Sequence, residues 1–156
     1  MSVPVRTIDP SAWVDAAPFA AHLERLCADA DLPWPVVATC AGVSLRTAWR
    51  LVGPGPRLRR IPRATAQQLW ALGPEDLDRL RRTWVWAGPT CTRVAGLVAA
   101  GIPVGRVAAL LGCTPAATAA LADGTPGSVP AVLAARAVVA VEVTDRARAR
   151  RSARAA

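Results

Sequence analysis

Several residue types are scarce or missing in this chain. Its 156 residues include no Lys, Asn or Tyr, and only one His, one Met and one Phe. Because codons for Lys, Asn, Tyr and Phe are rich in A and T, their scarcity indicates a very GC-rich genome, in which Arg replaces Lys. The excess of 19 basic over 11 acidic residues survives this bias, and the net charge of +8 predicts a polyanionic partner.

Few side chains are available for catalysis or metal binding. The chain has a single histidine, His22, and no CxxC pair. Because a zinc site needs closely spaced ligands, the sequence does not predict one. We expect the cysteines to be small buried hydrophobic residues, with a redox or metal role as the alternative: Cys27, Cys40, Cys91 and Cys113. The chain has no paired carboxylates, phosphate-binding Gly loop or partnered nucleophile, so we predict no enzyme activity, no cofactor and no metal.

Long apolar segments are also missing, although 53% of the residues are hydrophobic. The longest uncharged run, residues 107–122, is rich in Ala, contains Gly112 and Pro115, and is too short to span a membrane. Residues 1–15 carry one Arg and two Asp without a continuous apolar stretch, unlike a signal peptide. We therefore expect a cytoplasmic, nucleoid-associated protein with no membrane partner.

The positive charge is concentrated in two segments. Residues 46–63 carry six Arg and no acid, and residues 146–156 carry five Arg and no acid. The C-terminal tail is interpreted either as a disordered or fraying helical end or as a phosphate-binding segment. In the second case the contacts would come from Arg146, Arg148, Arg150 and Arg151.

Apolar periodicity and the positions of Pro and Gly predict an all-α fold, two tandem bundles that each contain a helix-turn-helix. Helices are expected at residues 18–30, 34–41, 45–52, 64–72, 74–86, 92–100, 104–111, 115–122 and 130 to about 150. No segment alternates convincingly like a strand.

An internal repeat appears when the chain is aligned with itself at a shift of seventy residues. Gly42-Val43-Ser44 then matches Gly112-Cys113-Thr114, and Cys40 matches Leu110. The copies are expected to meet near residues 87–89, where Gly and Pro interrupt the helical pattern. The predicted parts are an N-terminal extension (1–17), a DNA-binding domain (18–86), a second, degenerate helix-turn-helix domain (90–145) and the Arg-rich tail (146–156).

Residues 37–51 have the spacing of a helix-turn-helix, with a small Ala38 where the helices cross and Gly42 at the turn. Arg46 and Arg50 stand one turn apart, and Arg is well shaped for bidentate contact with guanine in the major groove. The residues expected on the outer, base-reading face are Ser44, Leu45, Arg46, Trp49 and Arg50. The other Trp residues are expected mainly in the core, with Trp34 and Trp70 capping the first bundle.

A basic arm, residues 53–63, follows this motif and is stiffened by Pro. We expect it to run along the DNA backbone, with the alternative of a solvated basic loop. The predicted phosphate contacts are Thr47, Arg57, Arg59, Arg60 and Arg63. One or two of Arg57, Arg59 and Arg60 would instead enter an adjoining minor groove.

Ala38–Leu51, the arm and the segment Ile61–Leu69 together resemble tandem helix-turn-helix DNA-binding proteins of actinobacteria and their phages, which are related to phage-repressor-type domains. The resemblance covers roughly residues 20–145. In that family a weaker second helix-turn-helix often follows, and residues 102–121 are similar to it. The resemblance implies a DNA-binding regulator without a cofactor.

The second copy keeps the apolar scaffold but carries Thr114, Pro115, Ala116, Ala119 and Ala120 on its outer face. Without Arg, Gln or Asn there, we expect packing on the first copy, homodimer formation, or a protein partner bound through residues 104–122. The predicted function is a sequence-specific double-stranded DNA-binding protein, a repressor-like transcriptional regulator. The alternatives are a polymerase-binding or antirepressor-like protein-interaction module and an accessory factor for DNA excision or recombination.

Overall fold

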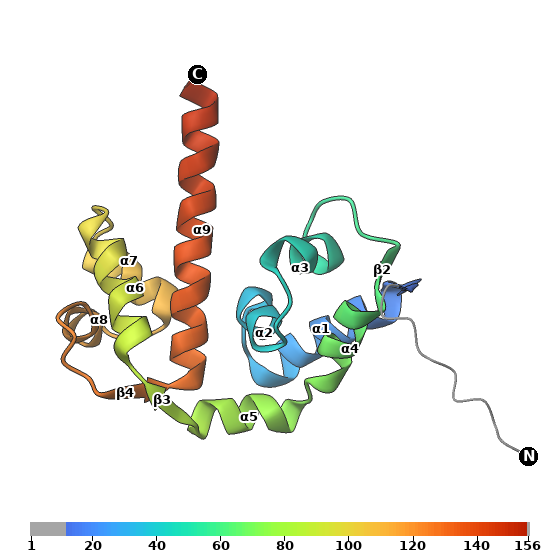
Figure 1. Ribbon diagram of the computed structural model, residues 1–156, viewed down its shortest axis with the longest axis horizontal. Helices are drawn as coiled ribbons and strands as arrows, with labels where there is room; N and C mark the ends of the chain where they lie inside the picture. The colour runs from blue at the N-terminus through green and yellow to red at the C-terminus, as the bar shows by residue number, and fades with distance from the viewer. Residues whose placement is uncertain (1–11, 156) are drawn as a thin grey trace, which may run out of the picture. The chain divides into compact units, whose positions relative to one another are not determined.

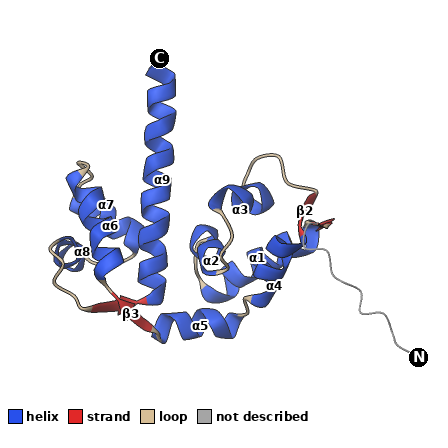
Figure 2. Cartoon of the chain, viewed as in Figure 1, coloured by secondary structure: helices blue, strands red, loops and turns tan. Residues whose placement is uncertain are grey.

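The computed structural model describes residues 12–155, which form two compact units divided between Pro74 and Glu75. Helices dominate both units and the only strands in the described part are short, so the expected all-α class is confirmed (Figures 1 and 2). The division lies earlier than the predicted boundary at residues 87–89. Residues 84–86 form a strand that pairs within the second unit. Residues 13–15 and 17, predicted as part of an extension, belong to regular elements of the first.

The same order of elements occurs in each unit: strand, three helices, strand, helix. The first unit contains β1 (Trp13–Asp15), α1 (Ala17–Ala30), α2 (Trp34–Cys40), α3 (Leu45–Val52), β2 (Arg60–Pro62) and α4 (Arg63–Ala71). After α5 (Pro74–Arg82), the second contains β3 (Trp84–Trp86), α6 (Gly88–Ala99), α7 (Val104–Leu111), α8 (Pro115–Ala122), β4 (Ser128–Pro130) and α9 (Ala131–Ala155).

The four strands are absent from the sequence-based expectation. Residues 74–86 were expected as one helix, but α5 ends at Arg82, where the Thr83 hydroxyl donates to the Arg79 carbonyl at 2.8 Å. The following Trp-Val-Trp has high strand propensity. Two antiparallel pairs result, with Val14 opposite Ile61 in the first unit and Val85 opposite Val129 in the second.

Leu, Val, Ile and Ala fill the core of each unit. In the first, Leu23, Leu51 and Ile61 are almost completely buried, and Ala38 and Ala48 are fully buried where α2 and α3 pack together. Burial of each such Leu or Ile side chain is worth roughly 1.5–3 kcal/mol. In the second unit the core is formed by Val94, Leu97, Val107, Leu111, Leu121 and Val129, with Ala87, Cys91, Ala137 and Ala140.

The expectation that most Trp residues lie in the core is wrong. Trp34 is half-buried, and the other five expose 42–75% of their surface. Trp13, Trp84 and Trp86 lie on short strands, whose outward positions alternate with the inward Val14 and Val85. Trp70 packs at the surface against Phe19 and His22, with ring centroids 6.2 and 5.0 Å apart.

Within residues 12–155, no single helix is long and apolar enough to cross a membrane. The apolar helices α7 and α8 reach that length and composition only as a pair, which is bent by 102°.

Candidate nucleic-acid interface

A tight turn joins α2 to α3. Gly42 adopts φ +72°, a left-handed conformation that favours glycine, and the Val43 amide donates to the Ala38 carbonyl at 2.9 Å. Ser44 then caps α3, because its Oγ accepts a hydrogen bond from the Thr47 amide at 3.2 Å. The Thr47 hydroxyl lies 2.9 Å from the same Oγ, so both predicted contact residues also hold the start of the helix.

Helix α3 has one buried and one exposed face. Leu45, Ala48 and Leu51 point into the core, whereas Arg46, Trp49 and Arg50 are exposed. The prediction that Leu45 belongs to the outer face is wrong, since only 2% of its surface is accessible. Its spacing of three residues from Ala48 and six from Leu51 places all three on one side of the helix.

The exposed face of α3 is strongly cationic. Arg46 and Arg50 stand four residues apart, which places them on neighbouring turns of the same face. Neither guanidinium forms a hydrogen bond or ion pair with any residue from 12 to 155. No described residue occupies their donors, which can serve an external acceptor such as a base edge or a phosphate.

Trp49 organises the start of the arm. Its ring lies 6.1 Å from that of Trp34, centroid to centroid. A Cβ at Gly53 would come within 2.4 Å of the Trp49 carbonyl oxygen, and one at Gly55 within 3.6 Å of its indole Nε1. The chain thus passes closely over Trp49, and Gly53 is required there by this approach. Trp49 lies on the predicted reading face, but its contact with the arm, which the Gly-Pro-Gly-Pro run signals, was not predicted.

The arm is fastened to the first unit at several points. The Leu58 amide donates to the Arg50 carbonyl at 2.8 Å, and the Ala16 amide donates to the Arg59 carbonyl at 2.9 Å. Arg60 donates to the Trp13 carbonyl at 2.7 Å, and Arg57 pairs with Glu24 at 3.2 Å. Since the ion pair is solvent-exposed on both sides, it contributes at most about 1 kcal/mol and yields readily to a stronger anion.

Two cationic side chains of this segment remain uncommitted within the described part of the chain. Arg59 is exposed in the arm, and Arg63 is half-buried at the first position of α4. Neither guanidinium has a hydrogen-bond or ion-pair partner among residues 12–155. The arm and α3 thus place four uncommitted guanidinium groups in the first unit: Arg46, Arg50, Arg59 and Arg63.

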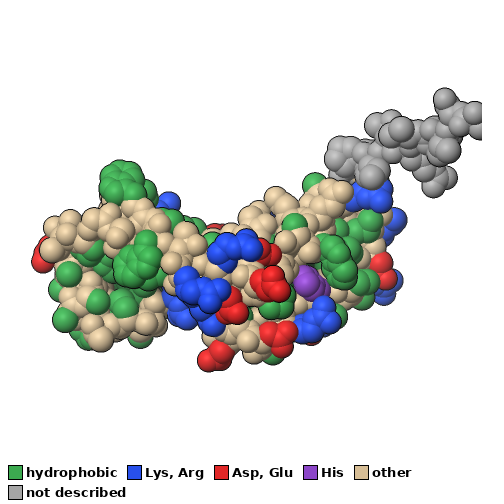
Figure 3. Space-filling view, turned by 90° about the horizontal axis from the view of Figure 1, so that it is seen from below, with side chains coloured by type: hydrophobic (Ala, Val, Ile, Leu, Met, Phe, Trp, Pro, Cys, Tyr) green, Lys and Arg blue, Asp and Glu red, His purple; other side chains and the backbone are tan. Residues whose placement is uncertain are grey.

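Charges on α5 are arranged differently. Acidic and basic side chains lie side by side over this helix (Figure 3). Arg79 pairs with Asp76 at 3.0 Å and Arg81 with Asp78 at 3.7 Å. This mixture is typical of a solvated helix face. The segment from α3 through the arm, with six Arg and no acid over residues 46–63, has no such internal compensation.

The C-terminal arginines continue α9, which was expected to end near residue 150 but runs to Ala155 (Figure 1). Arg146 pairs with Glu142, and Arg148 donates to the Ala100 carbonyl at 2.8 Å. Arg150 and Arg151 are exposed and make no ion pair with the described residues. Of the four predicted tail contacts, two are therefore held by the protein itself.

The environments of His22, Cys27 and Cys40 are set by the protein itself. The His22 Nε2–H donates to the Leu72 carbonyl at 3.1 Å while Nδ1 accepts from Arg25 at 3.3 Å, so both ring nitrogens are satisfied. Burial, with a smaller effect of Glu24, raises the pKa of Cys27 to about 11, and burial also raises the pKa of Cys40. Such thiols are protonated and poorly reactive near neutral pH.

The comparisons with known proteins add no family to this description: the chain matches no protein-family model, no curated protein and no solved structure. Among residues 12–155, no three or more His, Cys, Asp or Glu side chains are grouped so that they could hold a metal ion.

Proposed function

We propose that the protein binds double-stranded DNA sequence-specifically and acts as a repressor-like transcriptional regulator, with α2 and α3 forming a helix-turn-helix. The observation that carries this proposal is the exposed face of α3, where Arg46 and Arg50 present uncommitted guanidinium groups one turn apart. Each such group can donate to the O6 and N7 acceptors of one guanine in the major groove. On this proposal the protein is no enzyme and needs no cofactor.

The arm supports the same proposal as a backbone-binding element. Among residues 12–155 the guanidinium groups of Arg59 and Arg63 have no partner, and that of Arg57 is held only by an exposed ion pair. Phosphate contacts from such residues add affinity without sequence preference. Trp49, Ser44 and Thr47 serve mainly to position α3 and the arm, because their side chains already contact the protein.

The test is selection of bound duplexes from a random DNA pool at near-physiological salt. Wild type is compared with Arg46→Ala/Arg50→Ala and with a control, Arg79→Ala/Arg82→Ala, that removes the same charge from α5. We expect wild type and control to enrich one motif and the α3 variant to enrich none. Enrichment of the same motif by the α3 variant, or of no motif by wild type, would contradict the proposal.

The arm is tested separately by affinity measured at several salt concentrations. Arg59→Ala should weaken binding to all duplexes alike and reduce the slope of log K against log salt by about one. A selective loss on one sequence would instead identify Arg59 as a base-reading residue.

The second unit suits a homodimer or protein contact better than base reading. Helix α8 exposes Ala116, Ala117 and Ala119 and no charged side chain. Small residues let a second helix approach closely. If α8 joins two copies, the selected motif should be a palindrome with half-sites about 34 Å apart, and Ala116→Glu should abolish the dimer in analytical ultracentrifugation.

A further inference from the structure

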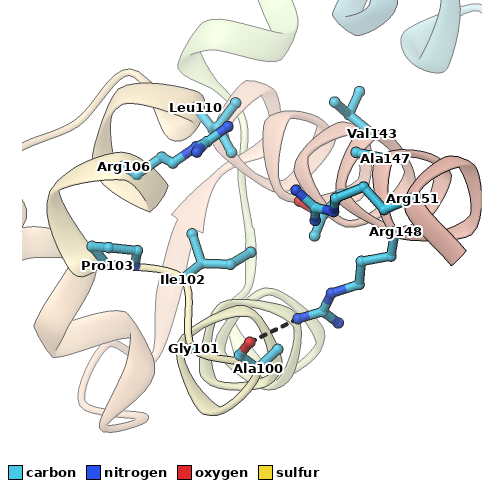
Figure 4. Close-up of a pocket in the computed structure, with 11 residues that line it drawn as sticks. Ala100, Gly101, Ile102, Pro103, Arg106, Leu110, Val143, Ala147, Arg148 and Arg151 are labelled. Atoms are coloured by element: carbon cyan, nitrogen blue, oxygen red, sulfur yellow. Dashed lines mark hydrogen bonds between the residues drawn. The ribbon is translucent and has the colours of Figure 1, made fainter. Parts of the chain in front are cut away.

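A groove in the second unit is lined by the end of α6, the turn at residues 101–103, α7 and the C-terminal half of α9 (Figure 4). Its volume is about 310 Å³. Three arginines line it, Arg106 from α7 and Arg148 and Arg151 from α9, and no acidic residue does. The groove combines this charge with the apolar side chains Ile102, Leu110 and Val143.

The guanidinium groups of the groove can bind an external anion. Arg148 donates to the Ala100 carbonyl at 2.8 Å, which fixes its guanidinium at the rim. The guanidinium groups of Arg106 and Arg151 form no hydrogen bond or ion pair with the described residues. Because three cations and no acid line the groove, a ligand with more than one negative charge would be attracted to it.

The apolar side chains indicate what else the ligand carries. Leu110 exposes 36% and Val143 44% of its surface, although both stand beside the arginines. A phosphate backbone alone would leave these groups without an apolar partner. A leucine- or phenylalanine-sized side chain would fill the recess and remove Leu110 and Val143 from water.

The groove exists because α9 is longer than its counterpart. Helix α4 of the first unit has 9 residues and α9 has 25, so residues 143–151 have no equivalent in the first unit. This extension supplies the wall of the groove that contains Val143 and two of the three arginines. The groove is therefore a feature of the second unit and includes none of the α3 or arm residues on which the DNA-binding proposal rests.

We propose that this groove binds an acidic, amphipathic peptide segment of a partner protein, in which carboxylates flank an apolar side chain. The carboxylates would pair with Arg106 and Arg151, and Arg148 would contribute a third cation. The apolar side chain would lie on Ile102, Leu110 and Val143. Complementary charge and the mixed lining favour this partner over a nucleic acid.

The test uses the full chain and fluorescein-labelled decapeptides in a polarisation titration. The probes are alternating Asp and Leu, alternating Asp and Ser, and alternating Lys and Leu. We expect saturable binding of the Asp-Leu peptide only. Arg106→Ala/Arg151→Ala should weaken that binding at least about tenfold, which corresponds to about 1.4 kcal/mol. Leu110→Gln should weaken it several-fold.

The control Arg93→Ala/Arg154→Ala removes the same charge outside the groove and should change the affinity less than about twofold, as should Arg46→Ala/Arg50→Ala. The proposal is overturned if the Asp-Leu peptide shows no saturable binding, if the Asp-Ser peptide binds equally well, or if the control loses as much affinity as the groove variant. It is also overturned if a 20-base-pair duplex displaces the peptide and depends on Arg106 and Arg151, because the groove would then be a nucleic-acid site.

Discussion

Helices α3 and α8 occupy equivalent places in the two units but present different chemistry to solvent. Each follows a turn with a positive-φ glycine, Gly42 at +72° and Gly112 at +67°, and each is capped by a hydroxyl that accepts from an amide at 3.2 Å. In α3 the exposed positions carry Arg46, Trp49 and Arg50. The corresponding positions seventy residues later are all alanine.

The comparison separates what the fold needs from what it leaves free. The amide at residue 43 donates to the carbonyl at 38, and the amide at 113 donates to the carbonyl at 108. Leu51 and Leu121 are both almost fully buried. The turn, the cap and the core leucine are therefore kept in both units, whereas the exposed residues of the helix differ. A functional difference between α3 and α8 must therefore lie in these exposed residues.

The largest effect is expected from removing the equivalent core leucines. Leu51→Ala and Leu121→Ala should each lower the free energy of unfolding by about 2–5 kcal/mol, because each leaves a cavity. Since each unit has its own core, amide hydrogen exchange should rise mainly in the unit that carries the substitution. Equal loss of protection in both units would show that they unfold together.

A graft sharpens the comparison of the exposed faces. Ala116→Arg/Ala120→Arg gives α8 the arginines of α3 on an equally capped helix. If the units differ only in these side chains, the graft should add a second sequence preference to the selected DNA, worth about 1–3 kcal/mol per Arg-guanine pair. The control Ala99→Arg/Ala109→Arg should raise affinity for all sequences alike. The same uniform rise from the graft would show that α8 cannot reach bases.

The caps should behave alike, with a smaller effect. Ser44→Ala and Thr114→Ala each remove the acceptor for one amide at a helix start and should cost about 1 kcal/mol in thermal unfolding. Ser44→Thr, which keeps the hydroxyl, should cost much less. A large difference between the two Ala variants would assign Ser44 a stability role beyond its cap, through its contact with Thr47.

The helices could be predicted because local signals agree: proline at first turns, glycine at ends and hydroxyl caps. The bounds expected for α3, α7 and α8 are those observed. The strands were missed because three residues are too few to show alternation. A shift of 71 residues would have revealed them, since Trp13-Val14 and Trp84-Val85 then coincide, as do Ala16 and Ala87.

The candidate site was predictable where charge alone decided exposure. Arg46 and Arg50 could be placed on the outer face from their charge. Leu45 was wrongly expected beside them, although its spacing to Leu51 puts it on the buried face. The Trp residues could not be placed from their size, because five of the six are exposed. The contacts that hold the arm, such as Arg60 with the Trp13 carbonyl, join residues far apart in sequence and carry no local signal.

The smallest effect is expected at the cysteines, where single residues at equivalent positions of the two units can be compared. At a shift of 71 residues Cys27 corresponds to Val98 and Cys91 to Ala20, which are apolar in both cases. Cys27→Val and Cys91→Ala should therefore each change the free energy of unfolding by less than about 1.5 kcal/mol and leave DNA binding unchanged. A loss of DNA binding in either variant would indicate that a thiol participates in function.

The pH dependence of Cys27 follows from its pKa of about 11 in the folded protein, against 9.0 for an ordinary thiol. Since folding favours the protonated thiol, the stability from this group is present below pH 9 and is lost as the pH rises from 9 to 11. In the folded protein at pH 9, only about one Cys27 in a hundred is a thiolate. Iodoacetamide should therefore modify Cys27 much more slowly than a free thiol at pH 9, with a rate that climbs toward pH 11, as measured by peptide mass spectrometry. Rapid modification at pH 8 would contradict the packing role that the repeat assigns to this residue.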